Sequence, residues 1–358
     1  MNFFISLTHA CQLRCSYCYA GDKFSRAIDL ATLDSAIDFI LSKAHNSFSL
    51  GFFGGEPLLE WEKLQYATQK LEELASAKGI KFSKTLTTNG LLLCKDKLNW
   101  LKEHNFFLVI SIDGNSQMHN RHRVYPNKKG SFKEVEGAVL RAVEVFNAER
   151  FTTVTVVTPQ NISNLSDSIK YLHQELGAKR TRVSVDYFAS WGDDTSTILQ
   201  EFKRLKEYIL ECYRKNIDVY VDIIDDKIKA HIEDSCYECR FGEFKIGIAP
   251  SGNLYPCERL IGEDTEELAI GDVKKGFNSK ALANIVASRG NRNIECQECA
   301  YKSRCINSCG CTNYILTGDI ALTGATVCFF QKLFIDSADE VANILYNEKN
   351  SLFLSKFY

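Results

Sequence analysis

The sequence lacks both a long apolar run and a strong excess of one charge. No stretch of about 18 apolar residues occurs, so we expect no membrane-spanning helix. The segment Met1–Leu7 lacks the basic start and extended apolar core of a signal peptide, which predicts a cytoplasmic protein. A formal net charge of -2 argues against a broad electrostatic surface for nucleic acid or an anionic membrane.

Common nucleotide-binding motifs are also absent. The chain contains neither a Walker loop nor GxGxxG, which argues against nucleotide binding through either of these glycine-rich loops. It contains no internal repeat and no low-complexity segment. Its 358 residues suffice for one large domain and a smaller one.

Cysteine, by contrast, is abundant, with 14 residues. In a reducing cytosol, cysteines clustered at short spacings are more often metal ligands than disulfides. All but Cys94, Cys212 and Cys311 fall into such clusters. The sequence therefore predicts a metal-binding protein.

The first part of the chain alternates strand-like and helix-like periodicity. Helical faces are predicted around Leu33–Leu41 and Phe132–Phe146, the second begun by a capping box of Ser131 and Glu134. Such alternation implies parallel βαβ units, in a closed or partial (β/α) barrel or an open doubly wound sheet. The predicted strands are Phe3–Leu7, Phe48–Phe53, Lys81–Thr87, Phe107–Ile112, Thr152–Val157 and Arg182–Tyr187.

The rhythm breaks from about Tyr220. Cys236–Cys328 is rich in cysteine and glycine and has little periodicity, so bound metal is expected to supply its stability. Helical spacing resumes from Phe330 to Leu345. We therefore predict a barrel over residues 1–225, a cysteine-rich domain over 226–330 and a closing helix over 331–358.

The first cysteine cluster follows the first predicted strand directly. Cys11, Cys15 and Cys18 are spaced to bind three irons of a [4Fe–4S] cluster, which leaves the fourth iron open for chemistry. The alternative is a zinc site completed by a distant ligand such as His9.

CX3CX2C followed by Tyr19 resembles the signature of the radical SAM family. The resemblance implies that the open iron chelates S-adenosylmethionine, whose reductive cleavage yields a 5'-deoxyadenosyl radical. It also implies that Gly54, Gly55 and Glu56 bind the methionine part, with Glu56 holding the amino group. Further cofactor-binding candidates are Asn89, Ser111, Asp113 and Arg123, the last within HNxxR (His119, Asn120 and Arg123), a stretch similar to one in anaerobic sulfatase-maturing enzymes. Because each motif follows a strand, all are expected at the carboxyl face of a parallel barrel.

The second cysteine region resembles the SPASM domain. CX12GX4C, from Cys239 to Cys257, precedes CX2CX5CX3C and a final cysteine. The resemblance implies two auxiliary [4Fe–4S] clusters, three in total, used for electron transfer or substrate docking. One ligand set would be Cys236, Cys239, Cys257 and Cys309; the other would be Cys296, Cys299, Cys305 and Cys328. Zinc ribbons are the alternative.

The same resemblance implies a peptide or protein substrate. Two reactions compete: crosslink or thioether formation in a ribosomally made peptide, and oxidation of Cys or Ser in a sulfatase to formylglycine. Asp222, Asp225 and Asp226 are candidates for a catalytic base by position alone. The first strand begins near Met1, which predicts that a separate protein binds the peptide leader or that the substrate docks without one.

Other outcomes stay open. A low-potential flavodoxin or ferredoxin is the expected electron donor. Epimerisation would need a thiol hydrogen donor, for which Cys94, Cys212 and Cys311 are available. A non-catalytic iron–sulfur carrier or zinc module is the interpretation from another class. The loop with one open iron argues against a carrier, which would ligate every iron.

Overall fold

The structure, a computed structural model, describes residues 1–147, 149–234, 239–290 and 292–358. These residues form two compact units that interleave along the chain. The first unit comprises Met1–Ile110, Arg123–Lys129 and Arg240–Arg289. The second comprises Ser111–His122, Gly130–Cys239 and Gly290–Tyr358. The predicted sequential division at residues 225 and 330 stays a prediction.

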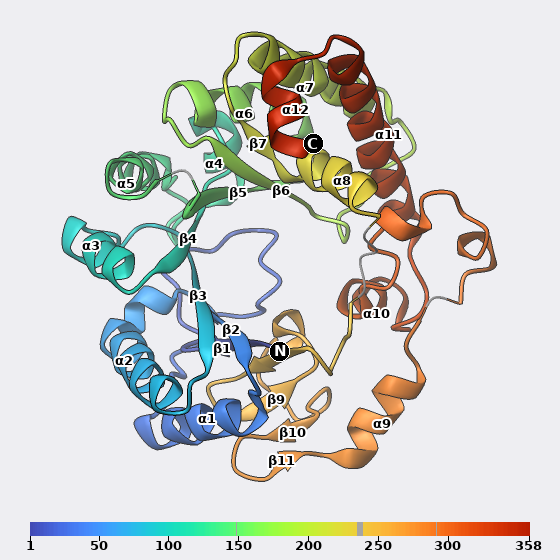
Figure 1. Ribbon diagram of the computed structural model, residues 1–358. Coiled ribbons are helices and arrows are strands. Elements are labelled where there is room, and N and C mark those ends of the chain that lie inside the picture. Colours follow the sequence, from blue (N-terminus) through green and yellow to red (C-terminus); the bar gives the residue numbers. More distant parts are fainter. Residues whose placement is uncertain (148, 235–238, 291) are drawn as a thin grey trace. The chain divides into compact units, whose positions relative to one another are not determined.

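The first unit is built on a sheet with the strand order β11-β10-β9-β8-β1-β2-β3-β4. Strands β8, β1, β2, β3 and β4 are parallel, whereas β8 to β11 pair antiparallel. Helices α1, α2 and α3 lie together along one side of β1–β4 (Figure 1). The strands are β1 (Asn2–Ser6), β2 (Ser47–Phe53), β3 (Lys81–Thr88), β4 (Phe106–Ser111), β8 (Lys245–Ile248), β9 (Asn253–Tyr255), β10 (Gly271–Asp272) and β11 (Gly276–Phe277). The helices are α1 (Leu30–Lys43), η1 (Pro57–Glu60), α2 (Trp61–Ala77), α3 (Lys95–Glu103), η3 (Glu258–Leu260) and α9 (Ser279–Ala287).

Helix α1 shows how the sequence produces this layer. The Asp29 carboxylate accepts a hydrogen bond from the Thr32 N–H at 2.7 Å and so caps the helix. Leu33, Ile37 and Ile40 then recur on one face and are fully buried, as are Phe3 and Ile5 of the strand beneath. Burial of this apolar face is what holds the helix on the sheet.

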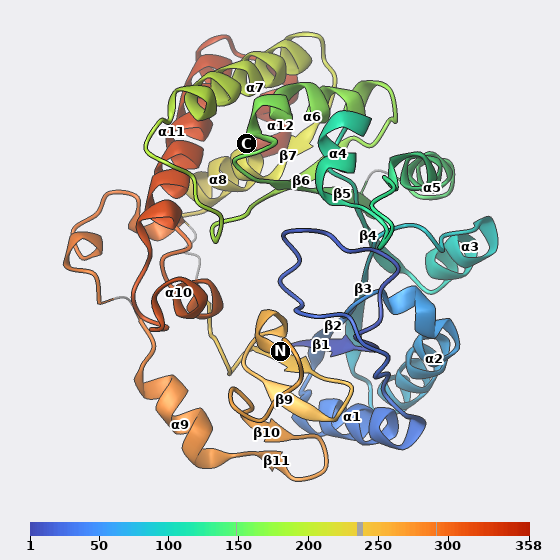
Figure 2. The same cartoon turned by 180° about the vertical axis from the view of Figure 1, so that it is seen from behind.

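The second unit contains the parallel strands β5, β6 and β7 in that order. Helix α11 packs along α8 and α7, and α12 lies against α11 and α8 (Figures 1 and 2). The strands are β5 (Phe151–Val157), β6 (Arg180–Val185) and β7 (Tyr220–Val221). The helices are α4 (Ser116–His122), α5 (Phe132–Val145), η2 (Ile162–Asn164), α6 (Leu165–Gln174), α7 (Ser196–Arg214), α8 (Asp222–Ile232), η4 (Ile294–Cys296), η5 (Lys302–Arg304), α10 (Gly310–Thr317), α11 (Ala325–Asn347) and α12 (Ser351–Phe357).

The six predicted strands and both predicted helical faces are confirmed. The predicted parallel pairing is found between β1 and β2, β2 and β3, β3 and β4, and β5 and β6. The helix expected after Cys328 is α11, which begins slightly earlier, at Ala325. The capping box is wrong. Helix α5 begins after Ser131, but the Ser131 hydroxyl makes no cap bond and instead pairs with the His119 ring at 3.0 Å.

The alternation of parallel strands and helices makes this an α/β fold of the kind found in partial TIM barrels. The cysteine-rich segment follows it, as predicted. No helix in the described part of the chain is both long and apolar enough to cross a membrane.

Candidate functional site

The cysteine loop, residues 11–18, leaves the sheet at the carboxyl end of β1. Its stem is closed by pairing of Thr8 and His9 with Arg26, because the Thr8 hydroxyl and the His9 N–H both donate to the Arg26 carbonyl, at 3.1 and 2.9 Å. A cavity of about 860 Å³ opens beside the loop, lined by Cys15 and Cys18. The loop therefore presents two thiols to an accessible space from a fixed base.

The Cys11 thiol is held by hydrogen bonds to its sulfur. Its sulfur accepts hydrogen bonds from the Leu13 N–H at 3.4 Å and from the Asn89 amide at 3.6 Å. Burial raises the pKa of the Cys11 thiol, and these two donors oppose that rise. Donors directed at a sulfur stabilise a thiolate, the form that ligates metal.

The residues Gly54, Gly55 and Glu56 pack backbone to backbone against the loop stem. The Gly55 N–H donates to the Thr8 carbonyl and the Glu56 N–H to the Ala10 carbonyl, both at 2.8 Å. A Cβ on Gly55 would lie 2.1 Å from the Ala10 oxygen, and Gly54 has a φ of +124°. Only glycine allows the backbone of residues 54–55 to approach residues 8–10 so closely. These glycines therefore position the cysteine loop, independently of any contact with S-adenosylmethionine.

The Glu56 side chain is fully buried. Its carboxylate accepts hydrogen bonds from the Thr88 hydroxyl at 2.7 Å, the Asn89 N–H at 2.8 Å and the Leu58 N–H at 3.0 Å. Burial raises the pKa of Glu56, and these three donors oppose the rise. Glu56 thus connects the end of β2 to the end of β3 by hydrogen bonds. Its contact with the amino group of S-adenosylmethionine stays a prediction.

Asn89 links the end of β3 to the cysteine loop. Besides reaching the Cys11 sulfur, its amide donates to the Gln12 side chain at 3.3 Å, and its oxygen accepts from the Leu91 N–H at 3.0 Å. Of the cofactor-binding candidates, Gly54, Gly55, Glu56 and Asn89 are therefore joined with the loop in the first unit. Arg123, also in this unit, lies with its guanidinium 5.3 Å from the centre of the Tyr17 ring, next to Cys18.

Ser111 and Asp113 belong to the second unit. Asp113 is fully buried and its carboxylate accepts from the Val156 N–H at 2.9 Å. Its own N–H donates to the His119 ring at 3.3 Å, and that ring continues to Ser131. His119 therefore has a structural position, between the end of β4 and the start of α5.

Asp222 and Asp225 lie at the start of α8. Asp222 accepts from the Val183 and Ile223 N–H groups, both at 2.8 Å, and burial raises its pKa to about 7. Asp225 pairs with Lys356 at 2.8 Å and accepts from the Val221 N–H, also at 2.8 Å. Both carboxylates hold β6, β7 and the C-terminal helix together, and a role as catalytic base stays a prediction.

The thiols of the second cysteine region form two neighbourhoods in the second unit. Burial raises the pKa of Cys305 to about 11, and the nearby Cys296 and Cys328 contribute to the rise. Hydrogen bonds from Cys239 and from Cys311, whose sulfur is 3.7 Å away, hold the pKa of Cys309 well below its usual range. These neighbourhoods are compatible with the two predicted ligand sets, which stay predictions.

Two further members of those sets are Cys257 and Cys236. Cys257 is buried in the first unit and donates to the Glu258 carboxylate at 3.4 Å. Cys236 lies outside the described residues. Lys227, whose Nζ donates to the Gln331 side chain at 2.8 Å, adds a half-buried lysine near Cys305.

Comparison with known proteins identifies the family. Residues 5–172 match the model of the Radical SAM superfamily. The uncharacterized protein MJ0907 of Methanocaldococcus jannaschii is 30% identical over 263 residues, which cover 73% of this chain and 86% of that protein. The chain belongs to the radical SAM superfamily.

Other radical SAM relatives carry functional names. A cysteine-type anaerobic sulfatase-maturating enzyme of Clostridium novyi is 22% identical over 324 residues, which cover 84% of each protein. A serine-type anaerobic sulfatase-maturating enzyme of Klebsiella aerogenes is 25% identical over 343 residues, covering 90% of this chain and 82% of that enzyme.

Solved structures confirm the fold. Native anSMEcpe with bound AdoMet superposes with a TM-score of 0.78 at 20% identity, covering 97% of this chain and 99% of that one; it has also been solved with AdoMet and the Cp18Cys peptide. Streptococcus suis SuiB bound to precursor peptide SuiA gives a TM-score of 0.61 at 18% identity, covering 91% of this chain and 75% of SuiB. The fold is therefore a partial barrel rather than an open doubly wound sheet.

Membership in the radical SAM superfamily implies a [4Fe–4S] cluster and S-adenosylmethionine, and the cysteine loop fits the cluster. Two thiols face the cavity, and the third carries two N–H donors. In the described part of the chain, no three His, Cys, Asp or Glu side chains converge on a single metal ion. In a [4Fe–4S] cluster each thiolate binds a different iron, so the three sulfurs need not converge on one ion.

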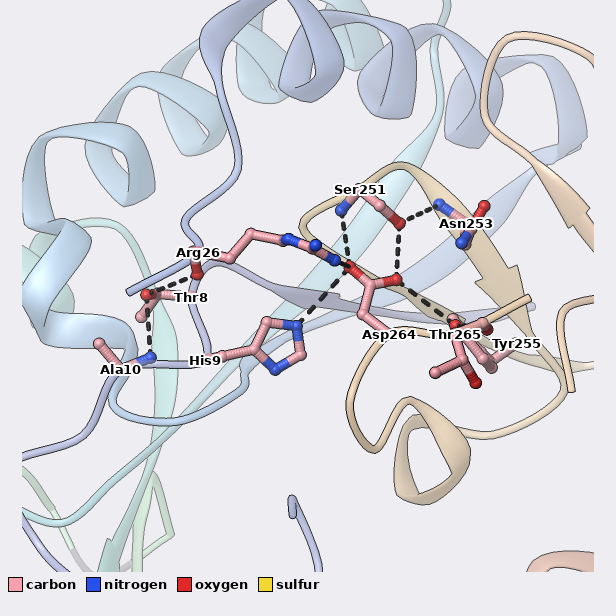
Figure 3. A network of polar contacts seen from close by, with 9 residues as sticks. All are labelled: Thr8, His9, Ala10, Arg26, Ser251, Asn253, Tyr255, Asp264 and Thr265. Carbon is pink, nitrogen blue, oxygen red and sulfur yellow. Dashed lines mark hydrogen bonds and ion pairs between the residues drawn. The ribbon is translucent and has the colours of Figure 1, made fainter. Parts of the chain in front are cut away.

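Sequence reasoning missed two carboxylates near this loop. Glu258, directly after Cys257, lines a small cavity with His9 and Gly54, and it pairs with Lys245 at 2.9 Å. Asp264 is buried at the loop stem, beside His9 and Arg26 (Figure 3). Adjacency to Cys257 is a signal for Glu258, whereas Asp264 stands in no recognisable motif.

Proposed function

We propose that the chain holds a [4Fe–4S] cluster on Cys11, Cys15 and Cys18, cleaves S-adenosylmethionine and modifies a side chain of a peptide or protein. The observation that carries the proposal is the cysteine loop, held at the end of β1 by backbone bonds to Gly55 and Glu56 and open to a cavity. The cluster and S-adenosylmethionine together supply a 5'-deoxyadenosyl radical that takes a hydrogen atom from the substrate.

The chain's own residues then orient these groups. Leu13 and Asn89 direct N–H groups at the Cys11 sulfur, and these donors favour the thiolate against the effect of burial. Gly54 and Gly55 keep the loop stem close to β2, since a side chain at either position would clash with the backbone of residues 8–10 or with Ser6. We propose that this stretch lies beside the methionine part. We further propose that Asn89, Ser111, Asp113 and Arg123 contact the nucleoside or carboxylate parts.

The cysteine-rich segment is proposed to carry two auxiliary [4Fe–4S] clusters. Cys236, Cys239, Cys257 and Cys309 would form one ligand set; Cys296, Cys299, Cys305 and Cys328 would form the other. The proximity of Cys305 to Cys296 and Cys328, and of Cys309 to Cys239, supports this division. A cluster without an open iron serves electron transfer or docking, so it is suited to accept the second electron that an oxidised substrate must lose.

Two reactions are candidates. Crosslink or thioether formation in a ribosomally made peptide is supported by the likeness in fold to SuiB, which was solved with a precursor peptide. Oxidation of Cys or Ser to formylglycine is supported by relatives of that name that align with 84% and 90% of the chain. A low-potential flavodoxin or ferredoxin would supply electrons, and a separate leader-binding protein would serve the first reaction.

The first experiment is anaerobic reconstitution, followed by counting of iron and sulfide and assay of 5'-deoxyadenosine. Wild type should bind about twelve irons and form 5'-deoxyadenosine, whereas Cys15→Ala should lose about four irons and the activity. Zinc in place of iron, or no 5'-deoxyadenosine, would instead support a metal-binding module or electron carrier.

Mass spectrometry then separates the two reactions. Peptides containing Cys or Ser are incubated with the reconstituted enzyme, S-adenosylmethionine and a reductant. Formylglycine formation from Cys replaces the sulfur by oxygen, whereas an internal crosslink or thioether removes only hydrogen. Formylglycine formation from Ser also removes only two hydrogens, so in the Ser peptide its aldehyde is identified by reaction with a hydrazine reagent. A Cys305→Ala variant that turned over its substrate normally would rule out electron acceptance by the cluster assigned to that residue.

A further inference from the structure

One buried carboxylate holds both sides of the cysteine-loop stem. Asp264 Oδ2 lies 3.6 Å from the His9 ring nitrogen Nε2 and 3.4 Å from the Arg26 guanidinium (Figure 3). His9 enters the loop two residues before Cys11, and Arg26 leaves it after Cys18. Asp264 itself comes from the segment after Cys257, more than 200 residues further along the chain.

The carboxylate is also fixed from its own side. Asp264 accepts hydrogen bonds from the Ser251 N–H at 3.0 Å and the Ser251 hydroxyl at 2.6 Å, with the Tyr255 hydroxyl at 3.4 Å. These donors belong to the turn and strand of the β8–β9 hairpin (Figure 3). The side chain of Asp264 has no solvent exposure, so solvent does not compete for these bonds.

The backbone conformation of Asp264 and the surroundings of His9 both favour this contact. Asp264 has a φ of +62°, in the left-handed region that few residues other than glycine, asparagine and aspartate adopt. His9 is buried, stacks on Phe24 at 4.3 Å between ring centres, and its Nε2 has no hydrogen-bond partner closer than the Asp264 carboxylate. Phe24 in turn lines the cavity beside Cys15 and Cys18.

We propose that Asp264 is a positioning residue for the cluster on the cysteine loop. Asp264 contacts both His9 and Arg26 and so fixes the distance between the two ends of the loop. It thereby also fixes the position of Phe24, which stacks on His9 beside the cavity. The segment that follows Cys257 thus controls the geometry of the cluster that binds S-adenosylmethionine. This inference rests on the proposed function, in that the loop must carry the cluster.

Three variants separate the contribution of the Asp264 carboxylate from that of the backbone conformation at residue 264. Asp264→Gly keeps the positive φ but removes the carboxylate, and Asp264→Asn keeps an acceptor for Ser251 but removes the charge. Ser251→Ala removes the hydroxyl donor and leaves the contacts of Asp264 with His9 and Arg26. Asn216→Gly, at an exposed position with a φ of +56°, controls for placing glycine at such a site.

The measurement is the rate at which the reconstituted protein releases iron to a chelator, in wild-type and Cys15→Ala backgrounds. Asp264→Gly should release the loop's irons roughly tenfold faster, since each hydrogen bond to a charged group is worth about that factor. Asp264→Asn should be intermediate, with Ser251→Ala and Asn216→Gly near wild type. In the Cys15→Ala background the fast phase should vanish.

Hydrogen–deuterium exchange gives a readout that does not depend on activity. Asp264→Gly should raise amide exchange in residues 8–28 and leave α5 and α7 unchanged. If Cys15→Ala retains the full iron content, the proposed function itself fails. If Cys15→Ala loses the loop's irons but Asp264→Gly releases them at the wild-type rate, or exchange rises evenly along the chain, this inference alone is overturned.

Discussion

At the scale of single residues, the same side-chain type has different roles according to its surroundings. Glu56 and Glu60 are four positions apart. Glu56 is fully buried with three donors, whereas Glu60 is partly exposed and pairs with Lys63 at 2.7 Å. A buried acceptor with several donors contributes far more to stability than a surface ion pair.

Glu56→Ala should therefore lower the free energy of unfolding by about 2–5 kcal/mol, because it leaves the Thr88 hydroxyl and the N–H groups of Leu58 and Asn89 without an acceptor. Glu60→Ala, the matched control, should change it by less than about 1 kcal/mol. Thermal unfolding of the reconstituted protein measures both. If Glu56→Ala instead kept the stability of wild type and lost only affinity for S-adenosylmethionine, the main role of Glu56 would be to bind S-adenosylmethionine and not to stabilise the fold.

Asp222 predicts a pH dependence of stability. Burial raises its pKa to about 7, and the charge of Asp226 adds to the rise. The native state therefore binds a proton that the unfolded chain, with a pKa near 4, has already released at pH 5–6. This contribution is complete below about pH 4 and is lost as the pH rises through about 7.

Asp222→Asn removes that contribution, while its amide oxygen can still accept from Val183. Relative to wild type, the variant should gain on the order of 2 kcal/mol in free energy of unfolding between pH 5 and pH 8. Denaturation midpoints at the two pH values test this. A difference between variant and wild type that does not vary with pH would show that Asp222 does not titrate as its surroundings indicate.

At the scale of elements, the end of β2 meets the stem of the cysteine loop through backbone hydrogen bonds of Gly55 and Glu56. Gly55→Ala would place a methyl group 2.1 Å from the Ala10 oxygen and so force the two segments apart. Gly137 lies within α5, where the nearest atom to a new Cβ is the end of the flexible Arg141 side chain at 3.3 Å. The same substitution therefore meets rigid backbone at Gly55 and a movable side chain at Gly137.

Gly55→Ala should reduce 5'-deoxyadenosine formation at least tenfold, because overpacking against backbone costs about 1–3 kcal/mol and displaces Cys11. Gly137→Ala should keep full activity and stabilise α5 by up to about 1 kcal/mol. Iron content and 5'-deoxyadenosine are measured for both. Full activity in Gly55→Ala would mean that the loop does not depend on this contact.

At the scale of the whole molecule, the two regions differ in how they are stabilised. The core of the second unit is apolar and includes Phe202, Phe330 and Phe334, with α11 packed along α8. The segment around η4 and η5 contains Cys296 and Cys305, yet neither short helix buries a residue. Bound clusters are expected to supply the stability that apolar burial does not.

Removal of iron should therefore expose this segment and leave the barrel strands folded. Trypsin should cut the iron-free protein at Lys302 or Arg304 much faster than the reconstituted protein, with no change at Lys84 within β3. Mass spectrometry of the fragments gives both rates in one experiment. Equal rates with and without iron at Lys302 would show that the segment folds without clusters.

The sequence by itself determined the strands β1 to β6 and the helices between them that were predicted, because periodicity and local propensity are properties of neighbouring residues. It did not determine β7 to β11, which have two to four residues each and are too short to show a period. It also determined the family, since CX3CX2C after a strand is a local spacing around Cys11, Cys15 and Cys18. The capping box failed for the opposite reason: the Ser131 hydroxyl had a distant alternative partner, the ring of His119.

Only the tertiary structure decided what the polar side chains do. Glu56 stands in a motif, but its donors at Thr88 and Asn89 come from another strand. Asp264 stands in no motif, yet it is buried against His9 and Arg26 more than 200 residues away. Hydrogen bonds and ion pairs of buried groups depend on which segments the fold brings together, and the separation of those segments along the chain carries no local signal.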